Sequence, residues 1–155
     1  MALIIGQINL NRSRTAVAEL NRQTRLDVVL ITEPYVYKEK VRGLEPSSAV
    51  VAKGLGPRAC IRTRGETWPV EAFSSRDLAV AAIRTGDKGV VYFASAYMDI
   101  GFDITKSGVW KLVEWCEESD LPQIIGMDAN AHSPLWGSGD LNRRGEVLEE
   151  HILQE

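Results

Sequence analysis

Two polar side chains suited to hydrolytic chemistry lie close together in the last third of the sequence. Asp128 and Asn130 are separated by one residue and follow Ile124 and Ile125, a short apolar run typical of a strand buried on both faces. Because alternate side chains of an extended backbone point the same way, the carboxylate and the amide can face one site. This combination suits an activated water beside a phosphate oxygen. The same residues also cap and turn ordinary loops, and spacing alone favours that simpler interpretation.

Glu33 and two asparagines end the strands predicted at the beginning of the chain. An unbroken apolar run at 28–31 predicts a buried central strand, and proline stops it directly after Glu33. The preceding strand, Leu3–Asn11, ends in two polar side chains on one face, Asn9 and Asn11. A carboxylate at the end of a central strand is either an ordinary loop carboxylate or a ligand for Mg²⁺, which usually takes one or two protein carboxylates together with water and substrate phosphate.

The elements that must position these residues alternate between strands, helices and hairpins. Ser13 is a suitable N-cap for a helix to about Arg25, which gives a strand–helix–strand unit. Apolar residues at i, i+3, i+4 and i+7 predict a second helix from about Lys106 to Glu118, leading into the strand before Asp128. The other expected elements are a surface loop at Tyr35–Ser48, strands at Ala49–Lys53 and Arg58–Arg62, a hairpin of Asp77–Arg84 and Val90–Met98 with its turn at 85–89, and a last helix after Asn142 with Val147, Leu148 and Ile152 inward.

Composition and charge limit the classes of protein to consider. At 155 residues, with 45% hydrophobic and 25% charged residues, the chain is expected to form one domain, 1–155. No apolar run approaches the roughly 20 residues needed to cross a bilayer, and the start of the chain has no signal-peptide pattern, so no membrane association is expected. Cys60 and Cys116 lack metal-binding spacing and indicate buried thiols in a reducing compartment.

The two halves of the chain differ in charge. Net charge is −3, but residues 1–76 hold 12 Lys/Arg against 7 Asp/Glu, and residues 77–155 hold 6 against 14. A basic first half could face phosphates while acidic residues of the second half help to hold a cation. Two ordinary solvated faces would give the same pattern.

The residues around Asp128 resemble those of a known family. Asp128-Ala129-Asn130-Ala131-His132, followed by Trp136-Gly137-Ser138, resembles the Asp-x-Asn-Ala-His…Trp-Gly segment of the apurinic-like endonucleases of arthropod-type non-LTR retrotransposons, in the exonuclease–endonuclease–phosphatase superfamily. The order Asn11, Glu33, Asp128 and Asn130 also matches that superfamily. The resemblance implies an α/β fold, the two-sheet α/β sandwich of this superfamily.

The resemblance also implies an activity and its partners. It implies a Mg²⁺-dependent endonuclease, with Mn²⁺ as the alternative ion, that nicks target DNA to prime reverse transcription by the reverse transcriptase domain of the same polyprotein. Such a domain is expected to be monomeric and nuclear. Glu33 would then hold the metal with Asn11 nearby, while Asp128 would orient or deprotonate the attacking water and Asn130 would hold a phosphate oxygen.

Several other residues receive roles from the resemblance. Tyr97 matches the tyrosine that ends a strand and orients the catalytic carboxylate, although a core or rim tyrosine is the competing interpretation. We expect His132 to shape its loop, because the superfamily's catalytic histidine belongs to a Ser-Asp-His segment near the domain's end. Basic residues that could contact DNA phosphates are Lys38, Lys40, Arg42, Arg62, Arg64, Arg143 and Arg144, though exposed arginines at a helix start are more often only solvated.

The sequence departs from the family pattern at its carboxyl end. The family domain is longer, and no Ser-Asp-His segment occurs within 1–155, so the chain is expected to hold the N-terminal two thirds of the sandwich. Such a chain alone is expected to nick DNA poorly and to expose open strand edges. Two alternatives remain open: a phosphoinositide phosphatase or sphingomyelinase-like phosphodiesterase of the same fold, or a DNA-binding or interaction module that has lost catalysis.

Overall fold

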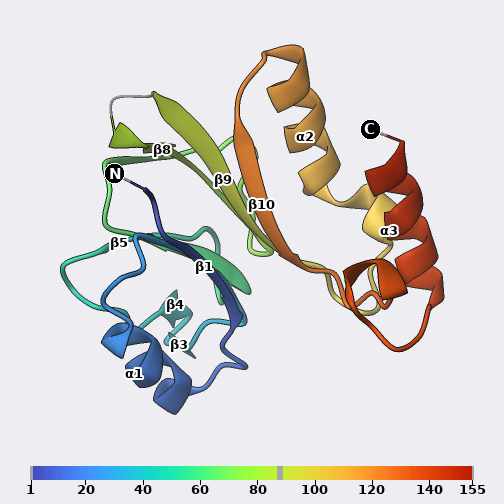
Figure 1. The fold of residues 1–155 in the computed structure, drawn as a ribbon. Coiled ribbons are helices and arrows are strands. Elements are labelled where there is room, and N and C mark those ends of the chain that lie inside the picture. Colours follow the sequence, from blue (N-terminus) through green and yellow to red (C-terminus); the bar gives the residue numbers. More distant parts are fainter. Residues whose placement is uncertain (1, 87–88, 155) are drawn as a thin grey trace.

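The computed structural model describes residues 2–86 and 89–154, which form ten strands, three α-helices and two short 3-10 helices (Figure 1). The strands are β1 (Ile5–Asn9), β2 (Val28–Thr32), β3 (Val36–Tyr37), β4 (Lys40–Val41), β5 (Ala49–Val51), β6 (Ala59–Thr63), β7 (Thr67–Pro69), β8 (Leu78–Arg84), β9 (Val90–Tyr97) and β10 (Gln123–Asp128). The helices are α1 (Arg14–Arg22), η2 (Ile104–Lys106), α2 (Gly108–Glu118), η3 (Pro134–Trp136) and α3 (Arg143–Leu153).

The strands form two four-stranded sheets that pack face to face. The first sheet has the order β1-β2-β6-β5 and the second the order β10-β9-β8-β7, while β3 and β4 form a small separate hairpin. One edge of each sheet is a parallel pair, β1 with β2 and β10 with β9, and the remaining pairs are antiparallel. The fold class predicted from the sequence, an α/β sandwich of two sheets, is confirmed.

Three apolar layers hold the sandwich together. Leu30, Ile61, Ile83 and Phe93 fill the space between the sheets and are almost completely buried. Helix α1 covers the outer face of the first sheet, and α2 and α3 cover the outer face of the second. Burying a side chain of this size contributes roughly 1.5–3 kcal/mol relative to exposure. The helices packed on the outer faces therefore stabilise each sheet, and with it the position of the residues at the strand ends.

The sheets approach closely between β2 and β10. A Cβ atom added to Gly126 would lie 2.8 Å from Cδ1 of Leu30 and 3.1 Å from Cδ of Gln7, so any larger side chain would push the two strands apart. On the neighbouring strand, the buried Ser95 hydroxyl donates to the carbonyl oxygen of Ile31 at 2.7 Å. A missing side chain and a direct hydrogen bond thus fix the spacing of the sheets near the ends of their parallel strands.

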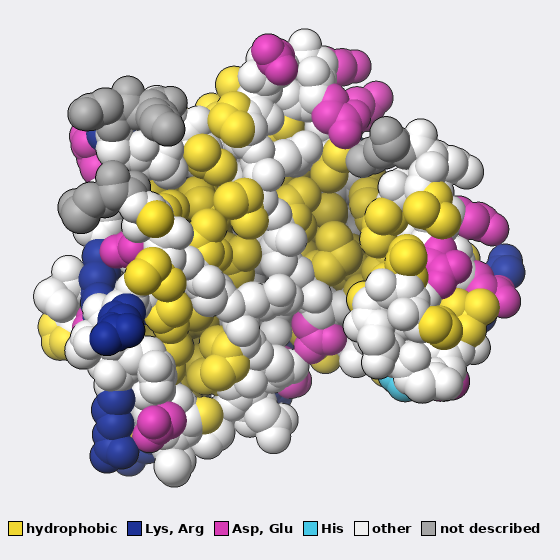
Figure 2. Space-filling view, viewed as in Figure 1, with side chains coloured by type: hydrophobic (Ala, Val, Ile, Leu, Met, Phe, Trp, Pro, Cys, Tyr) yellow, Lys and Arg dark blue, Asp and Glu magenta, His cyan; other side chains and the backbone are white. Residues whose placement is uncertain are grey.

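The prediction that the strand before Asp128 is buried on both faces is wrong. Within the described residues, strand β10 pairs with β9 alone and lies at the edge of its sheet, where Ile124 is 39% exposed. Strand β1 is the corresponding edge of the first sheet and exposes Ile5 and Ile8. Figure 2 shows hydrophobic side chains gathered over this face of the molecule, around β1, β9 and β10. An apolar run does not distinguish an edge strand from a central one.

Most other predicted elements are confirmed with shifted ends. Helix α1 begins after the predicted N-cap, with the Ser13 hydroxyl accepting from the Ala16 N–H, but ends three residues early at Arg22. The expected surface loop contains the β3–β4 hairpin, and β7 was not predicted. Strands β8 and β9 pair as expected, while residues 87 and 88 of their predicted turn lie outside the described residues. The predicted stripe of α2 is buried, but Ile152 of α3 is 47% exposed rather than inward.

Charge on the visible face follows the asymmetry of the sequence. In the view of Figure 2, Lys and Arg gather over the α1 side of the first sheet, and most Asp and Glu lie over α2 and α3. Within residues 2–86 and 89–154, no helix has the length and apolar character required to span a membrane.

Candidate active site

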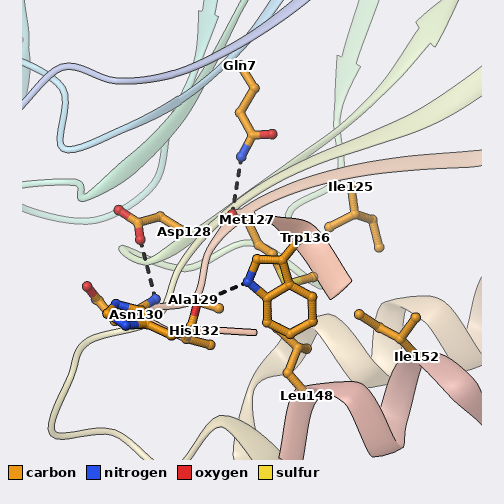
Figure 3. Close-up of a pocket in the computed structure, with 11 residues that line it drawn as sticks. Gln7, Ile125, Met127, Asp128, Ala129, Asn130, His132, Trp136, Leu148 and Ile152 are labelled. Carbon is orange, nitrogen blue, oxygen red and sulfur yellow. Dashed lines mark hydrogen bonds between the residues drawn. The ribbon is translucent and has the colours of Figure 1, made fainter. Parts of the chain in front are cut away.

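The carboxylate of Asp128 is held between the two sheets. Asp128 ends β10, and its Oδ2 accepts a hydrogen bond of 2.7 Å from Nδ2 of Asn9, the last residue of β1. Two residues earlier on β1, the Gln7 amide donates to the Met127 carbonyl oxygen at 3.2 Å (Figure 3). A hydrogen bond to an ionised acceptor is short and strong. The carboxyl ends of the parallel pairs in both sheets therefore meet at Asp128.

Asn9 was noted in the sequence at the end of the first strand but was given no role in the site. The expectation placed Asn11 in the site, on the assumption that strand alternation continued through Asn9-Leu10-Asn11. Strand β1 ends at Asn9, and Asn11 has a left-handed φ of 48°, so its exposed side chain leaves the alternation. Its own N–H donates to Oδ1 of Asn9 at 2.8 Å, which orients the Asn9 amide toward Asp128. The sequence pattern that could have predicted this role is the spacing of Gln7 and Asn9, because alternate residues of a strand share one face.

Left-handed backbone is concentrated around this end of the sheets. Of the seven non-glycine residues described with positive φ, four are Asn11, Arg12, Glu33 and Asn130, with φ between 46° and 55°. Sparsely populated backbone conformations cost of order 1 kcal/mol or more each and persist where surrounding structure enforces them, often at functional sites. Two main-chain hydrogen bonds hold Glu33 in this conformation. The Glu33 carbonyl accepts the Arg12 N–H at 2.8 Å, and the Glu33 N–H donates to the Arg58 carbonyl at 2.9 Å.

Glu33 keeps a carboxylate that could hold a divalent cation, and its role as a metal ligand stays a prediction. It follows the fully buried strand β2, whose carboxyl end is the one that meets Asp128, and its side chain is half-buried. Among residues 2–86 and 89–154, no Lys or Arg forms an ion pair with it. No group of three His, Cys, Asp or Glu is preassembled for a metal in that same part of the chain. Mg²⁺ needs only one or two protein carboxylates, so the donor set fits this ion rather than a closed protein cage.

The loop after Asp128 is braced by the first turn of α3. The Asn130 amide donates to the Met98 carbonyl at 2.8 Å, leaving its second amide proton and its oxygen for other partners. The Asn142 side chain caps α3 and accepts the His132 N–H at 2.9 Å. At Gly145 a Cβ would collide with the His132 carbonyl, so only glycine fits. This bracing fixes Asn130 relative to Asp128.

Tyr97 is next to Asp128 but does not hold its carboxylate directly. The two residues are register partners at the ends of β9 and β10. Among the described residues the tyrosine hydroxyl forms no hydrogen bond with Asp128, so the expected orienting role remains a prediction. His132 is exposed, and its Nδ1 lies 3.0 Å from Asp140. Its main-chain and side-chain bonds are internal to the loop, in agreement with the loop-shaping role expected from the sequence.

A cavity of about 580 Å³ lies beside the carboxylate on the side of α3 (Figure 3). Asp128, Asn130 and His132 line its polar part, and Trp136 and Ile152 belong to its apolar part. The Trp136 indole donates to the Ala131 carbonyl at 3.1 Å, which fixes the ring at the rim. The cavity therefore leaves space beside Asp128 on the side of α3.

Two of the arginines expected to contact DNA, the buried Arg62 and the exposed Arg64, pair with one carboxylate at the end of the first sheet opposite to this site. Arg62 lies in β6 rather than in a loop, is 3% exposed and pairs with Glu45 at 3.1 Å. Arg64 pairs with the same carboxylate at 2.6 Å, and its hydrogen bond and positive charge lower the pKa of Glu45 against the opposing effect of burial. Arg62 lies near, and Arg64 directly after, the end of β6 that pairs with the start of β2, opposite to Glu33. The assignment of Arg62 as a DNA contact is wrong because its side chain is buried, and that of Arg64 stays a prediction.

Arg144 also has a structural role in place of the expected one. Its guanidinium donates to four main-chain carbonyl oxygens, those of Met98, Ile100, Phe102 and Ala129. No donor geometry toward a DNA phosphate remains without breaking these bonds. Of the basic residues expected to contact DNA, those that remain exposed are Lys38, Lys40, Arg42, Arg64 and Arg143, and Arg143 pairs with Glu146 on its own helix.

Comparisons with known proteins bear on the resemblance found in the sequence. No protein-family model matches the chain. The 115 kDa protein of the type-1 retrotransposable element R1DM of Drosophila melanogaster is 29% identical over 161 residues, which cover 96% of this chain. The chain spans only 16% of that relative's length. The endonuclease domain of TRAS1, a telomere-specific non-LTR retrotransposon, superposes with a TM-score of 0.78 and 22% identity over 99% of this chain and 70% of that chain.

The fold is that of the TRAS1 endonuclease domain. Both comparisons confirm the resemblance to non-LTR retrotransposon proteins that the Asp128–Ser138 motif indicated. The structural likeness shows the two-sheet sandwich fold. The residues at the ends of the sheets are the basis for assigning the chemistry.

Proposed function

We propose that the chain is the endonuclease part of a non-LTR retrotransposon protein, which nicks target DNA in the nucleus to prime reverse transcription. The observation that supports this most directly is the Asp128 carboxylate, fixed by Asn9 at 2.7 Å where the parallel strands of both sheets end. A single oriented carboxylate beside a cavity can orient and deprotonate one water next to a phosphodiester. The TRAS1 domain of the same fold is by its title an endonuclease.

In this proposal each residue has one task. Asp128 orients the attacking water and accepts its proton through the carboxylate oxygen that Asn9 does not occupy. Asn130 directs its free amide proton at a non-bridging phosphate oxygen. Glu33 would hold Mg²⁺ or Mn²⁺, and when bound this ion supplies stabilisation of the charge that develops on the phosphate. Exposed Lys38, Lys40 and Arg42 on and beside the small β3–β4 hairpin would contact flanking phosphates.

Nicking of supercoiled plasmid DNA tests the proposal. Asp128→Asn should lower the Mg²⁺-dependent nicking rate by roughly 10²–10⁴-fold, because a positioned acid–base group contributes about that much. Glu33→Gln should also lower this rate strongly, because it weakens the carboxylate proposed to hold the metal. Glu66→Gln is the matched control, since Glu66 is an exposed carboxylate paired with Arg84 at the opposite end of the second sheet. Equal rates for Glu33→Gln and the wild type would refute the assignment of Glu33.

The products and alternative substrates separate this function from its rivals. A primer for reverse transcription needs a 3′-hydroxyl, so nicked plasmid should be extended by a polymerase without further treatment. Phosphoinositides and sphingomyelin should not be hydrolysed. Hydrolysis of either lipid without DNA nicking would favour the phosphodiesterase alternative, and DNA binding without nicking would favour the inactive binding module.

A further inference from the structure

Arg58 makes the densest set of charged contacts at the site end of the sheets, and none of the roles above uses its side chain. Its Nε and Nη2 donate to the two carboxylate oxygens of Asp77 at 2.6 and 2.7 Å. Its Nη1 donates to Asp99 at 2.6 Å, and the Arg58 side chain is 19% exposed. A bidentate pair plus a third charge-assisted bond fixes the plane of the guanidinium. Arg58 therefore has one orientation, imposed by two segments of the second sheet.

The same residue contacts both sides of the candidate site. Its guanidinium carbon lies 5.0 Å from the centroid of the Tyr97 ring, within the range of a cation–π interaction. Its carbonyl oxygen accepts the N–H of Glu33 at 2.9 Å. In turn, the Tyr97 N–H donates to the carbonyl of Asp77, the partner of the Arg58 side chain, at 2.8 Å. One residue at the start of β6 thus links the backbone of Glu33 to the ring and backbone of Tyr97.

Two groups of this cluster, Arg58 and Asp99, have pKa values shifted in favour of their charged forms. The hydrogen bonds to Asp77 and then to Asp99 outweigh burial and raise the pKa of Arg58 above its ordinary value. The pKa of Asp99 is lowered by the Gly101 N–H and then by Arg58. The guanidinium and its acceptor at Asp99 accordingly remain ionised while the nuclease acts, and the cluster does not loosen by titration.

We propose that Arg58 is a positioning residue for the nuclease reaction, which fixes Tyr97 and the Glu33 backbone in one geometry across the two sheets. The inference rests on the proposed function, since it concerns the same site. Because Tyr97 is the register partner of Asp128, movement of Tyr97 is transmitted to the strand end that carries the carboxylate. Misplacement of reacting groups by about 1 Å costs about 10²-fold in rate.

The second sheet offers a matched control for the chemistry of this cluster. Arg84 also donates to a carboxylate, that of Glu66 at 2.8 Å, and its guanidinium carbon also lies over an aromatic ring, that of Trp68 at 5.5 Å. It ends β8 at the side opposite to the site, whereas Leu78, at the site side, begins that strand. Arg84→Met removes the same kinds of interaction without touching the strand ends near Asp128.

The test measures kcat and KM for plasmid nicking in the protein that carries this chain, for the wild type, Arg58→Met, Arg58→Lys and Arg84→Met. Arg58→Met should lower kcat by about 100-fold while KM for DNA changes by less than about threefold, since the residue positions groups and does not bind substrate. Arg58→Lys keeps the charge but loses the planar fork, so it should recover less than about a tenth of the wild-type kcat. Arg84→Met should match the wild type.

Coupling to Tyr97 separates positioning from general stability. On a Tyr97→Leu background, Arg58→Met should cost only about threefold more, because residues that act as a unit are not additive. Full additivity, or an Arg58→Met rate equal to that of Arg84→Met, would overturn the inference while leaving the nuclease intact. If the wild type binds DNA but does not nick it, the proposed function fails, and the role of Arg58 fails with it. A cooperative thermal unfolding transition for Arg58→Lys would show that the loss of kcat occurs in folded protein.

Discussion

Replacement of Asn9 by alanine should disable the site while leaving the sandwich folded. Asn9→Ala removes the 2.7 Å donor to Asp128 and the acceptor of the Asn11 N–H. A hydrogen bond to a charged group is worth about 1.5–3 kcal/mol, and each 1.36 kcal/mol is tenfold in rate. If the whole of that energy serves to hold the carboxylate in its reactive orientation, kcat should fall by roughly 10- to 150-fold.

The assay is single-turnover nicking of supercoiled plasmid with saturating enzyme, so that DNA affinity does not enter the rate. Asn21→Ala is the control, because the Asn21 amide also donates a 2.8 Å hydrogen bond, to the Gly43 carbonyl, far from the carboxylate. It should lower thermal stability about as much as Asn9→Ala and leave the nicking rate unchanged. Asn11→Ala should reduce the rate less than Asn9→Ala, because the Asn11 side chain does not contact Asp128.

The reverse order would refute this reasoning. A large loss for Asn11→Ala with little effect of Asn9→Ala would mean that the Asn9–Asp128 contact is a structural link between the sheets and that Asn11 acts on substrate or metal. Equal and complete losses for both variants, without loss of folding, would mean that the turn rather than the single hydrogen bond sets the position of the carboxylate.

Three further outcomes are expected. Gly126→Ala should destabilise the fold by about 1–3 kcal/mol, seen as a lower Tm, because its Cβ would lie 2.8 Å from Leu30. Arg144→Met should lower Tm by freeing main-chain carbonyls, whereas Arg143→Met should keep Tm and reduce the slope of log DNA affinity against log salt by about one. Burial raises the pKa of Cys60 to about 12, above about 8.5 in the unfolded chain. The free energy of unfolding should therefore fall as pH rises above about 8.5, because only the unfolded thiol loses its proton there, and this fall should be smaller in Cys60→Ala.

The sequence predicted best what depends on local pattern. The run at Val28–Thr32 was expected to be a buried central strand and is buried at every position, and the stripe of α2 was placed residue by residue. The Asp-x-Asn-Ala-His motif beginning at Asp128 indicated a resemblance to non-LTR retrotransposon proteins, which both comparisons confirm. Cys60 and Cys116 were expected as free buried thiols and are.

What the sequence could not predict depends on contacts between distant segments. Two consecutive isoleucines occur both in edge strands and in central strands, so the sequence did not predict the exposure of β10. Arg62 looked like a loop cation because its partner Glu45 is 17 residues away. Arg58 gave no signal at all, since its partners Asp77 and Asp99 lie in other elements. Charge in a sequence says little about which cations are already neutralised.

The hydrogen bond between Asn9 and Asp128 joins residues 119 positions apart. At about 5–20 residues per second, a ribosome needs roughly 6–24 s to travel from one to the other, and a loop of that length costs about 2 kcal/mol more to close than one of ten residues. During that interval the first sheet and α1 can form, but no carboxylate is present for Asn9 to hold. A nascent chain that has not yet reached β10 therefore holds Asn9 without its acceptor, and the contact between the two sheets at this end forms only after β10 is synthesised.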